Sequence, residues 1–350
     1  MRQSGGGRGA CQLLDTWIQL AAKSVQHSRE ARMRIGFYTN YTPEIAAFAE
    51  RIGFRSLELS AWPHSFVNPE RATTAETDAM MKDLAARDIE VSALGYYPNV
   101  LSQDEDEAEH ARDYLMKVIT QARRLGVPVV ARFAGRNPHL SVEDNLPGFK
   151  EVYSRIMDHA ETEGVKIAME NCPMMDRFTM EGENIAFSPE IWKALFELVP
   201  SDHLGLELDP SHFIWQRIDY VKAVKTFGDR IFHVHAKDME IRHDLLAESG
   251  IYGVALSRFD GLGHGWWRAR TPGWGEVDWA ALITALIEVG YKGNIDIEHE
   301  DDVFAEVTRT SSVITEEEIV SKYGTERKGL ELGYKTLAQY VPNARWPGVA

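Results

Sequence analysis

The chain has 350 residues, of which 44% are hydrophobic, and its 38 Lys and Arg against 53 Asp and Glu give a formal net charge of −15. This composition is typical of a soluble globular protein, and the acidic balance argues against a broad surface for nucleic-acid phosphates. Cys11 and Cys172 are too few for a secreted disulfide framework, and no apolar run reaches the roughly 18 residues that span a bilayer. We therefore expect a reduced, cytoplasmic setting, with no nucleic-acid or membrane partner.

The first 32 residues differ from the rest of the chain. They start with a Gly-rich stretch and contain neither the apolar core nor the small-residue cleavage site of a secretory signal, so an Arg-rich transit peptide is the remaining alternative. Met33 is followed at once by the β-prone run RIGFY. We therefore expect an N-terminal extension over 1–32, one folded domain over 33–342 and a C-terminal tail over 343–350.

From Met33 onward, short strands alternate with amphipathic helices. The first strand is expected over Arg34–Tyr38, and Thr42-Pro43-Glu44 is the start signal of a helix that ends near Gly53. Further strands are expected over Ser56–Ser60, Glu90–Leu94, Val127–Phe133, Lys166–Glu170, Leu204–Asp209, Arg230–His235 and Asn294–Glu298. Further helices are expected near 74–87, 106–125, 148–163, 189–199, 219–227 and 278–289, with a last one after about Glu316.

Eight strands separated by helices predict an α/β fold, a closed (β/α)8 TIM barrel in a single domain. A doubly wound open sheet is the alternative, and it would carry a Gly-rich phosphate turn after the first strand. Residues 37–41, at the end of that strand and just after it, contain no glycine. One long excursion, from Asp238 to Glu276, separates the seventh strand from its helix. Loops of this length usually act as lids or binding loops.

In barrel enzymes the catalytic side chains stand at the C-terminal ends of the strands. Each of the fifth to eighth strands ends in a residue that can bind a divalent metal, and these residues are Glu170, Asp209, His235 and Glu298. Singly, each could be a helix cap, a salt-bridge partner or a hydrogen-bonded core residue. Together, their carboxylates would repel one another unless a cation lay between them. The donor set suits one divalent ion, with Mn²⁺ as first choice and Mg²⁺, Co²⁺ or Zn²⁺ as alternatives.

Alternation along the strands puts further polar residues on the same faces as these four. The pairs that share a face are Glu207 with Asp209, His233 with His235, and Asp296 with Glu298. Cys172, two residues after Glu170, is interpreted as a buried structural thiol and not as a ligand.

Four stretches of the chain, taken together, resemble a known family. The stretches are ENCPM (170–174), LDPSHFIWQRIDY (208–220), DRIFHVHAKD (229–238) and PGWGEVDW (272–279). They resemble the xylose isomerase-like TIM-barrel superfamily, the sugar phosphate isomerase/epimerase family, and the resemblance covers nearly all of Met33 to Tyr340. It implies metal ligation by the four strand-end residues and contact of His212 with a substrate oxygen. It also implies a substrate-binding Arg before a Pro-Gly turn, which is either Arg268 or Arg270.

The residues and the resemblance agree on a divalent-metal-dependent sugar isomerase or epimerase. A metal that holds a carbonyl oxygen and the neighbouring hydroxyl stabilises the enediolate formed when the C–H between them is deprotonated. Glu170 and Glu298 are the expected catalytic pair, working from opposite faces of the substrate. Three alternatives stay open. They are a lyase or hydrolase acting on a keto-sugar or 3-keto-glycoside, a DNA-repair endonuclease and a sugar-binding barrel without turnover.

Substrate contacts are expected around the mouth of the barrel. The candidates are His64, His212, Trp215, Lys237, Arg268 and Arg270. For Trp215 the alternative is packing of the long loop, and for Lys237 it is a salt bridge with Asp238 or Glu298. Because no Gly-rich phosphate loop is evident, we expect an unphosphorylated sugar or a glycoside as substrate. Assembly into a homo-oligomer is left open.

Overall fold

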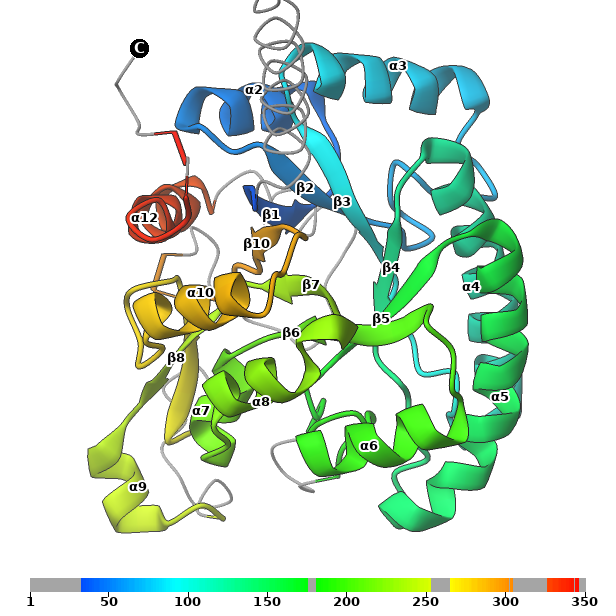
Figure 1. Cartoon of the computed structure of the whole chain (residues 1–350), viewed down its shortest axis with the longest axis vertical. Helices are drawn as coiled ribbons and strands as arrows, with labels where there is room; N and C mark the ends of the chain where they lie inside the picture. The colour runs from blue at the N-terminus through cyan, green and yellow to red at the C-terminus, as the bar shows by residue number, and fades with distance from the viewer. Residues whose placement is uncertain are drawn as a thin grey trace, which may run out of the picture.

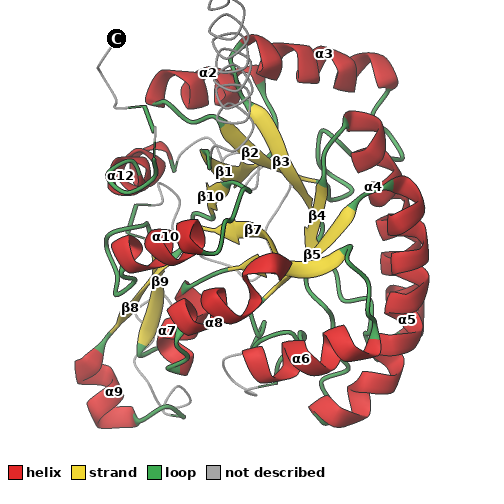
Figure 2. Ribbon diagram, viewed as in Figure 1, coloured by secondary structure: helices red, strands yellow, loops and turns green. Residues whose placement is uncertain are grey.

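The computed structural model describes residues 33–175, 181–252, 265–301, 303–304, 326–342 and 344–345. Its centre is a closed barrel of eight parallel strands in the order β1-β10-β7-β6-β5-β4-β3-β2, with helices around it (Figures 1 and 2). The strands are β1 (Ile35–Thr39), β2 (Ser56–Ser60), β3 (Glu90–Gly95), β4 (Val129–Arg132), β5 (Lys166–Glu170), β6 (Leu204–Leu208), β7 (Ile231–His235) and β10 (Ile295–Ile297). Strand β1 pairs in parallel with both β2 and β10, which closes the sheet. The predicted TIM barrel is confirmed.

The helices lie on the outside of the barrel. They are α2 (Pro43–Ile52), α3 (Thr74–Ala86), α4 (Glu105–Leu125), α5 (Val142–Glu163), α6 (Pro189–Leu198), α7 (Ser211–Gln216), α8 (Tyr220–Phe227), α10 (Trp279–Glu288) and α12 (Arg327–Leu337). Helix α2 begins as predicted, because the Thr42 hydroxyl accepts a hydrogen bond from the backbone N–H of Ile45. Helix α5 begins six residues before its predicted start, because Ser141 caps it there. Pro147 lies inside this helix.

The excursion after β7 contains regular structure that the sequence pattern does not predict. Strands β8 (Asp238–Ile241) and β9 (Trp267–Arg270) pair in antiparallel fashion, and α9 (His243–Ser249) follows β8. The hairpin projects at the lower left of Figure 1. Its apolar side chains form a small core with Trp215 of α7, separate from the main core, and they are Met239, Ile241, Trp266 and Trp267. Residues 253–264 lie outside the described part.

Side chains alternate between the two faces of the barrel wall. On β2, Leu57 and Leu59 point outward and pack in the main core beneath the helices, whereas Ser56 and Glu58 are buried and hydrogen-bonded to polar groups from other strands. Glu58 is 0% exposed. A buried polar group is costly unless it is paired, so the interior of this barrel requires a network of polar contacts.

The two ends of the chain are only partly covered by the described residues. Residues 1–32 and 346–350 lie outside them, so the expected extension and tail stay predictions. The last expected helix, after about Glu316, is represented by α12, which begins at Arg327.

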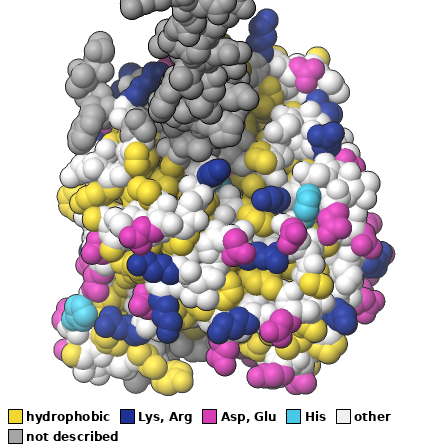
Figure 3. Space-filling model, viewed as in Figure 1, with side chains coloured by type: hydrophobic (Ala, Val, Ile, Leu, Met, Phe, Trp, Pro, Cys, Tyr) yellow, Lys and Arg dark blue, Asp and Glu magenta, His cyan; other side chains and the backbone are white. Residues whose placement is uncertain are grey.

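Among the helices that are described, none combines the length and apolar character needed to cross a membrane. On the face shown in Figure 3, basic side chains alternate with acidic ones.

Candidate metal centre

The four strand-end residues come together at the C-terminal ends of β5, β6, β7 and β10. Each of Glu170, Asp209, His235 and Glu298 offers one donor atom, and these atoms lie within 4.8 Å of one another. Three of the residues are buried, whereas the side chain of Glu298 is 21% exposed. The four donors therefore form a compact set with one side open toward solvent, which we name the metal centre.

Three donor atoms of the metal centre lack a hydrogen bond. Among the described residues, Oε1 of Glu170, Oδ2 of Asp209 and Nδ1 of His235 are buried without a hydrogen-bond partner, and of these atoms Oδ2 of Asp209 has an ion-pair contact with Lys237. Leaving a buried polar atom unpaired costs about 1–3 kcal/mol, and native proteins pair nearly all such atoms. Nδ1 of His235 lies 3.6 Å from Oε1 of Glu170. A divalent cation at this point would satisfy these atoms together, so the donors fit a metal ion in position and in chemistry.

His212 and Lys237 lie against the metal centre. Nε2 of His212 is 3.3 Å from Oδ2 of Asp209 and 3.6 Å from Oε1 of Glu170. Nζ of Lys237 is 2.5 Å from Oε2 of Glu298 and 3.0 Å from Oδ2 of Asp209. Of the two salt bridges considered for Lys237, the structure therefore shows the one with Glu298. Both residues contact Asp209, and each of them also contacts one further candidate ligand.

These contacts keep the carboxylates ionised despite their burial. Burial opposes ionisation of Asp209, but Lys237 and His212 beside it lower the pKa of this carboxyl. Burial likewise opposes a charge on Glu170, and the neighbouring rings of His212 and His235, each 3.6 Å from its Oε1, lower its pKa. Burial also works against the Lys237 ammonium, yet Asp209 and Glu298 hold its pKa well above the usual value. Asp209 and Glu170 are thus held in the deprotonated form that binds metal ions.

A second polar cluster lies one layer deeper in the barrel. We name it the inner cluster, and its members are Glu58, Tyr97, Glu207, His233 and Asp296. Nδ1 of His233 is 2.8 Å from Oε1 of Glu207, and Nε2 of the same ring is 3.1 Å from Oδ2 of Asp296. The Tyr97 hydroxyl is 2.7 Å from Oε1 of Glu58 and 2.9 Å from Oε2 of Glu207. Nε2 of His235 reaches down to this cluster and lies 2.6 Å from Oε2 of Glu58.

The inner cluster also has metal-binding residue types within reach of one another, since donor atoms of Glu58, Glu207, His233 and His235 lie within 4.8 Å. These groups, however, are already hydrogen-bonded to each other. Burial and the neighbouring Glu58 raise the pKa of Glu207 to about 8, and the Tyr97 hydroxyl lies within donating distance of both Glu207 and Glu58. Hydrogen bonds thus already pair Glu207 with His233 and Glu58 with Nε2 of His235. Because three donors of the metal centre lack such bonds, the metal centre is the better site for an ion.

The two arginines of β9 are held by carboxylates. Arg268 donates two hydrogen bonds to Glu240 of β8, at 2.9 and 3.0 Å. Arg270 donates to Oδ2 of Asp301 at 2.9 Å and also contacts Glu240. Asp301 follows Glu298 by three residues, so Arg270 is tied to the segment that carries a candidate ligand. The structure therefore ties Arg270 to the segment after β10 and Arg268 to β8, and neither arginine belongs to the donor set.

The remaining expected substrate contacts lie farther from the metal centre. The ring of Trp215 stacks on Trp267 with centroids 5.1 Å apart and planes 5° apart, which is the packing role considered for it. The ring of His64, after β2, stacks on Trp62 at 6.3 Å.

Cys172 is half-buried, its sulfur accepts a hydrogen bond from the backbone of residue 174, and burial raises the pKa of its thiol. A neutral thiol agrees with a structural role.

Sequence reasoning did not single out Glu58, and it gave Tyr97 no role beside Glu58. Glu58 lies on β2, and the alternation in SLELS already places it on the face opposite Leu57 and Leu59. An acidic residue in the middle of a buried strand was the available signal. Tyr97 follows β3 and gives no such signal, because an aromatic residue near a strand end is usually part of the core.

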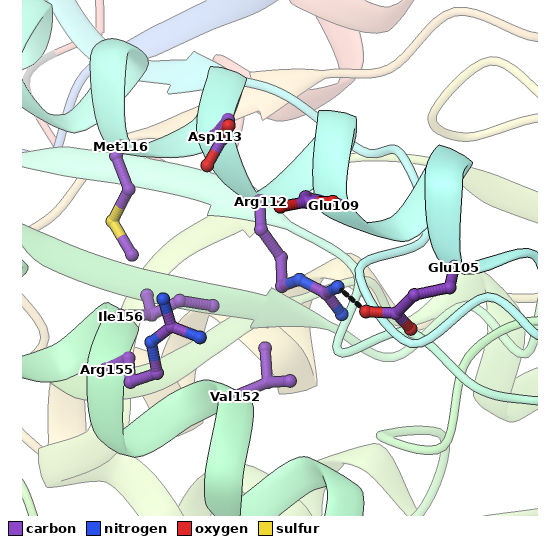
Figure 4. Close-up of a pocket in the computed structure, with 8 residues that line it drawn as sticks. All are labelled: Glu105, Glu109, Arg112, Asp113, Met116, Val152, Arg155 and Ile156. Carbon is purple, nitrogen blue, oxygen red and sulfur yellow. Dashed lines mark hydrogen bonds and ion pairs between the residues drawn. The ribbon is translucent and has the colours of Figure 1, made fainter.

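A surface groove of about 210 Å³ lies between α4 and α5 (Figure 4). Within it, Arg112 forms an ion pair with Glu105, and Val152 and Ile156 supply apolar atoms from α5. The groove belongs to the outer layer of helices and is separate from the strand ends that carry the metal centre.

Known proteins resemble this chain over most of its length. A family model described as xylose isomerase-like TIM barrel matches residues 46–320. The uncharacterized protein YfiH of Bacillus subtilis (strain 168) is 26% identical over 285 residues, which cover 73% of this chain and 87% of that protein. An inosose dehydratase of Clostridium perfringens (strain 13) is 23% identical over 245 residues, which cover 65% of this chain and 75% of that protein.

Solved structures show the same fold. D-Psicose 3-epimerase from Clostridium cellulolyticum H10, solved with D-tagatose, has a TM-score of 0.61 at 14% identity and covers 88% of this chain and 99% of its own. The IOLI protein, solved with a zinc atom, has a TM-score of 0.61 at 18% identity and covers 89% of this chain and 100% of its own. At these identities the likeness is one of fold. Together with the match of the family model, it shows that the chain belongs to the xylose isomerase-like TIM barrel family.

Proposed function

We propose that this protein is a divalent-metal-dependent sugar isomerase or epimerase. The observation that carries the proposal is the metal centre, where donor atoms of Glu170, Asp209, His235 and Glu298 lie within 4.8 Å of one another. Those of Glu170, Asp209 and His235 are buried without a hydrogen bond to the described residues. The site lies at the C-terminal ends of barrel strands, where catalytic groups of such barrels stand. Similar proteins include a D-psicose 3-epimerase and inosose dehydratases, which supports a carbohydrate as substrate.

A bound divalent ion would supply Lewis-acid chemistry toward a carbonyl oxygen and the hydroxyl beside it. We propose Mn²⁺ as this ion, with Mg²⁺, Co²⁺ and Zn²⁺ as alternatives. Oxygen-rich donors with one imidazole suit each of these metals, and the zinc atom in the IOLI protein shows that a related barrel accommodates one of them.

Glu170 and Glu298 are the proposed acid and base. Glu170 ends β5, and Glu298 follows β10, with β6 and β7 between these strands in the barrel. The two carboxylates therefore approach the centre from different sides, so that one can take the proton next to the carbonyl and the other can return one. Return to the same carbon gives epimerisation, and return to the neighbouring carbon gives isomerisation.

Other side chains are proposed to bind and orient the substrate. His212 is the best placed of them, because it contacts Asp209 and both of its ring nitrogens lack hydrogen bonds within the described chain. Lys237 lies beside Asp209 and Glu298 and can stabilise negative charge that develops on a substrate oxygen. The other proposed contacts, farther from the donors, are His64, Trp215, Arg268 and Arg270.

A lyase acting on a keto-sugar or 3-keto-glycoside is the second candidate. Proton removal next to a carbonyl is shared by both reactions, and loss of a group from the next carbon gives elimination. The inosose dehydratases among the relatives favour this candidate. The two differ in their products, because an isomer keeps the mass of the substrate whereas elimination releases water or an aglycone.

The test is a substrate screen in D₂O with added Mn²⁺, read by NMR and mass spectrometry. Unphosphorylated ketoses, inososes and 3-keto-glycosides form the panel, and Asp209→Asn is the control that lacks one ligand. An epimerase or isomerase incorporates deuterium into a product of otherwise unchanged mass. Protein with stoichiometric metal that neither exchanges deuterium nor converts any member of the panel contradicts the proposal.

A further inference from the structure

The two nitrogens of His235 are in different surroundings. Nδ1 faces the metal centre, 3.6 Å from Oε1 of Glu170, and has no hydrogen bond to any residue that the structure describes. Nε2 points the other way and lies 2.6 Å from Oε2 of Glu58. A neutral imidazole has one N–H and one lone pair. If Nε2 carries the proton and donates it to Glu58, the lone pair is on Nδ1, toward the metal centre.

Glu58 is itself tightly held. It is 0% exposed, and its other oxygen, Oε1, lies 2.7 Å from the Tyr97 hydroxyl. Gly95 of β3 makes room for it, because a Cβ atom at position 95 would lie 2.5 Å from Oε1 of Glu58 and 2.9 Å from the Tyr97 ring. The rings of Tyr97 and Tyr38 both lie 6.4 Å from that of His235. The carboxylate therefore has a fixed place and a fixed direction.

We propose that Glu58 is a positioning residue that decides which nitrogen of His235 faces the metal centre, and that Tyr97 holds Glu58 for this task. The inference rests on the proposed metal binding by His235. Histidines that bind metals almost always donate their other ring N–H to a carboxylate or carbonyl, which fixes the tautomer and raises the basicity of the ligand. Glu58 comes from β2, which β1 and β10 separate from the strand of His235.

A hydrogen-bonding role for Glu58 differs from a role as ligand of a second ion. A second ion in the inner cluster would take the lone pair of Nε2 of His235 and displace the proton shared with Glu58. The two roles therefore predict different metal counts per chain and different protonation of the same nitrogen.

The experiment combines zinc binding with ¹⁵N NMR of histidine-labelled, zinc-loaded protein. Zinc affinity is measured by competition with a chelator for the wild type, Glu58→Gln, Tyr97→Phe and Glu90→Gln. The last variant is the control, since Glu90 begins β3 at the far end of the barrel wall with its side chain 48% exposed. The signals of His235 are identified by their loss in His235→Gln.

We expect one zinc per wild-type chain, with the proton of His235 on Nε2 and the metal on Nδ1. Glu58→Gln should bind zinc about 10–100-fold more weakly and lose the wild-type Nε2–H signal, because an amide accepts this hydrogen bond less strongly than a carboxylate. Tyr97→Phe should show a smaller loss, and Glu90→Gln none. Should Glu58→Gln fail to fold, Tyr97→Phe decides, because it removes a single hydroxyl.

Three results overturn the positioning role. They are wild-type affinity and unchanged His235 signals in both Glu58→Gln and Tyr97→Phe, zinc on Nε2 of His235, or two zinc ions per wild-type chain. If the wild type binds zinc and the variants keep its zinc affinity and its His235 signals, only the role of Glu58 is refuted. A wild type that binds no divalent metal refutes the proposed metal centre, and the positioning role with it.

Discussion

Lys237 and Asp209 form a buried ion pair within the metal centre, with Nζ of Lys237 3.0 Å from Oδ2 of Asp209. The same ammonium lies 2.5 Å from Oε2 of Glu298. The centre contains three carboxylates, so one ammonium and one divalent ion together balance their charge while His235 stays neutral. Lys237 is therefore a partner of the carboxylates and a competitor of the metal at the same time.

Replacing Lys237 with Met should separate these two effects. Removal of one partner of a buried ion pair costs about 3–5 kcal/mol, so the free energy of unfolding of the metal-free protein should fall. Metal should then bind more tightly, because the nearby positive charge is gone, and Mn²⁺ should raise the melting temperature by more than in the wild type. Thermal unfolding with and without Mn²⁺ measures both. Lys335→Met, which breaks an exposed pair with Glu331, is the control, and equal behaviour of the two variants would contradict the prediction.

Asp209→Asn should abolish stoichiometric metal binding without unfolding the protein. Oδ1 of Asp209 accepts a hydrogen bond from the backbone of Ser211 at 2.8 Å, and an asparagine oxygen can keep that bond. The lost negative charge weakens the metal centre directly. Elemental analysis should find one ion per wild-type chain and little in the variant. Asp202→Asn, at a fully exposed position, serves as the control. Full metal content in Asp209→Asn would remove this residue from the donor set.

Glu170→Gln and Glu298→Gln should keep the fold and some metal but lose turnover. The amide oxygen can still coordinate, whereas it cannot carry the proton, and a general acid or base contributes about 10²–10⁴-fold. With a substrate from the screen, one variant should still exchange a C–H with D₂O, and the other should fail even at exchange. Turnover near the wild-type rate in either variant with metal bound would move the proton transfer to His212 or Lys237.

Arg268→Ala and Arg270→Ala should differ in stability. Arg270 forms a buried pair with Asp301, so its loss should cost about 3 kcal/mol, whereas the more exposed pair of Arg268 with Glu240 contributes about 1 kcal/mol or less. Metal content should be unchanged in both. Replacing the arginine that binds substrate should raise KM, because the guanidinium no longer donates to the substrate oxygens. Wild-type kinetics in both variants would leave the hairpin of β8 and β9 with a structural role.

Deletion of residues 1–32 should leave the barrel intact. Strand β1 begins at Ile35 and pairs with both β2 and β10, so the eight strands of the described residues already close the barrel. The truncated protein should keep its melting temperature and its metal content. A truncated protein that is insoluble, or that melts many degrees lower, would show that the first 32 residues belong to the folded domain.

The periodicity of the sequence is sufficient to predict most of the barrel. Strands β2 and β5 occupy the expected residues, and the helix start at Thr42 follows from its own side chain. These are local features, decided by residues within a few positions of one another. The hairpin of β8 and β9 could not be predicted in this way. Its strands are separated by more than twenty residues, and packing of Trp267 on Trp215 of α7 holds them in place.

For the site, sequence alone determined which residues stand at the strand ends, since parallel strands of a barrel bring their C-terminal ends to one mouth. That is why Glu170, Asp209, His235 and Glu298 could be named together. Only the tertiary structure decided what surrounds them. Glu58 reaches His235 because the sheet closes through β1 and β10, and Lys237 bends back onto Asp209. Hydrogen bonds and ion pairs across a barrel depend on closure and side-chain direction at the scale of ångströms, and no local pattern in the chain encodes that distance.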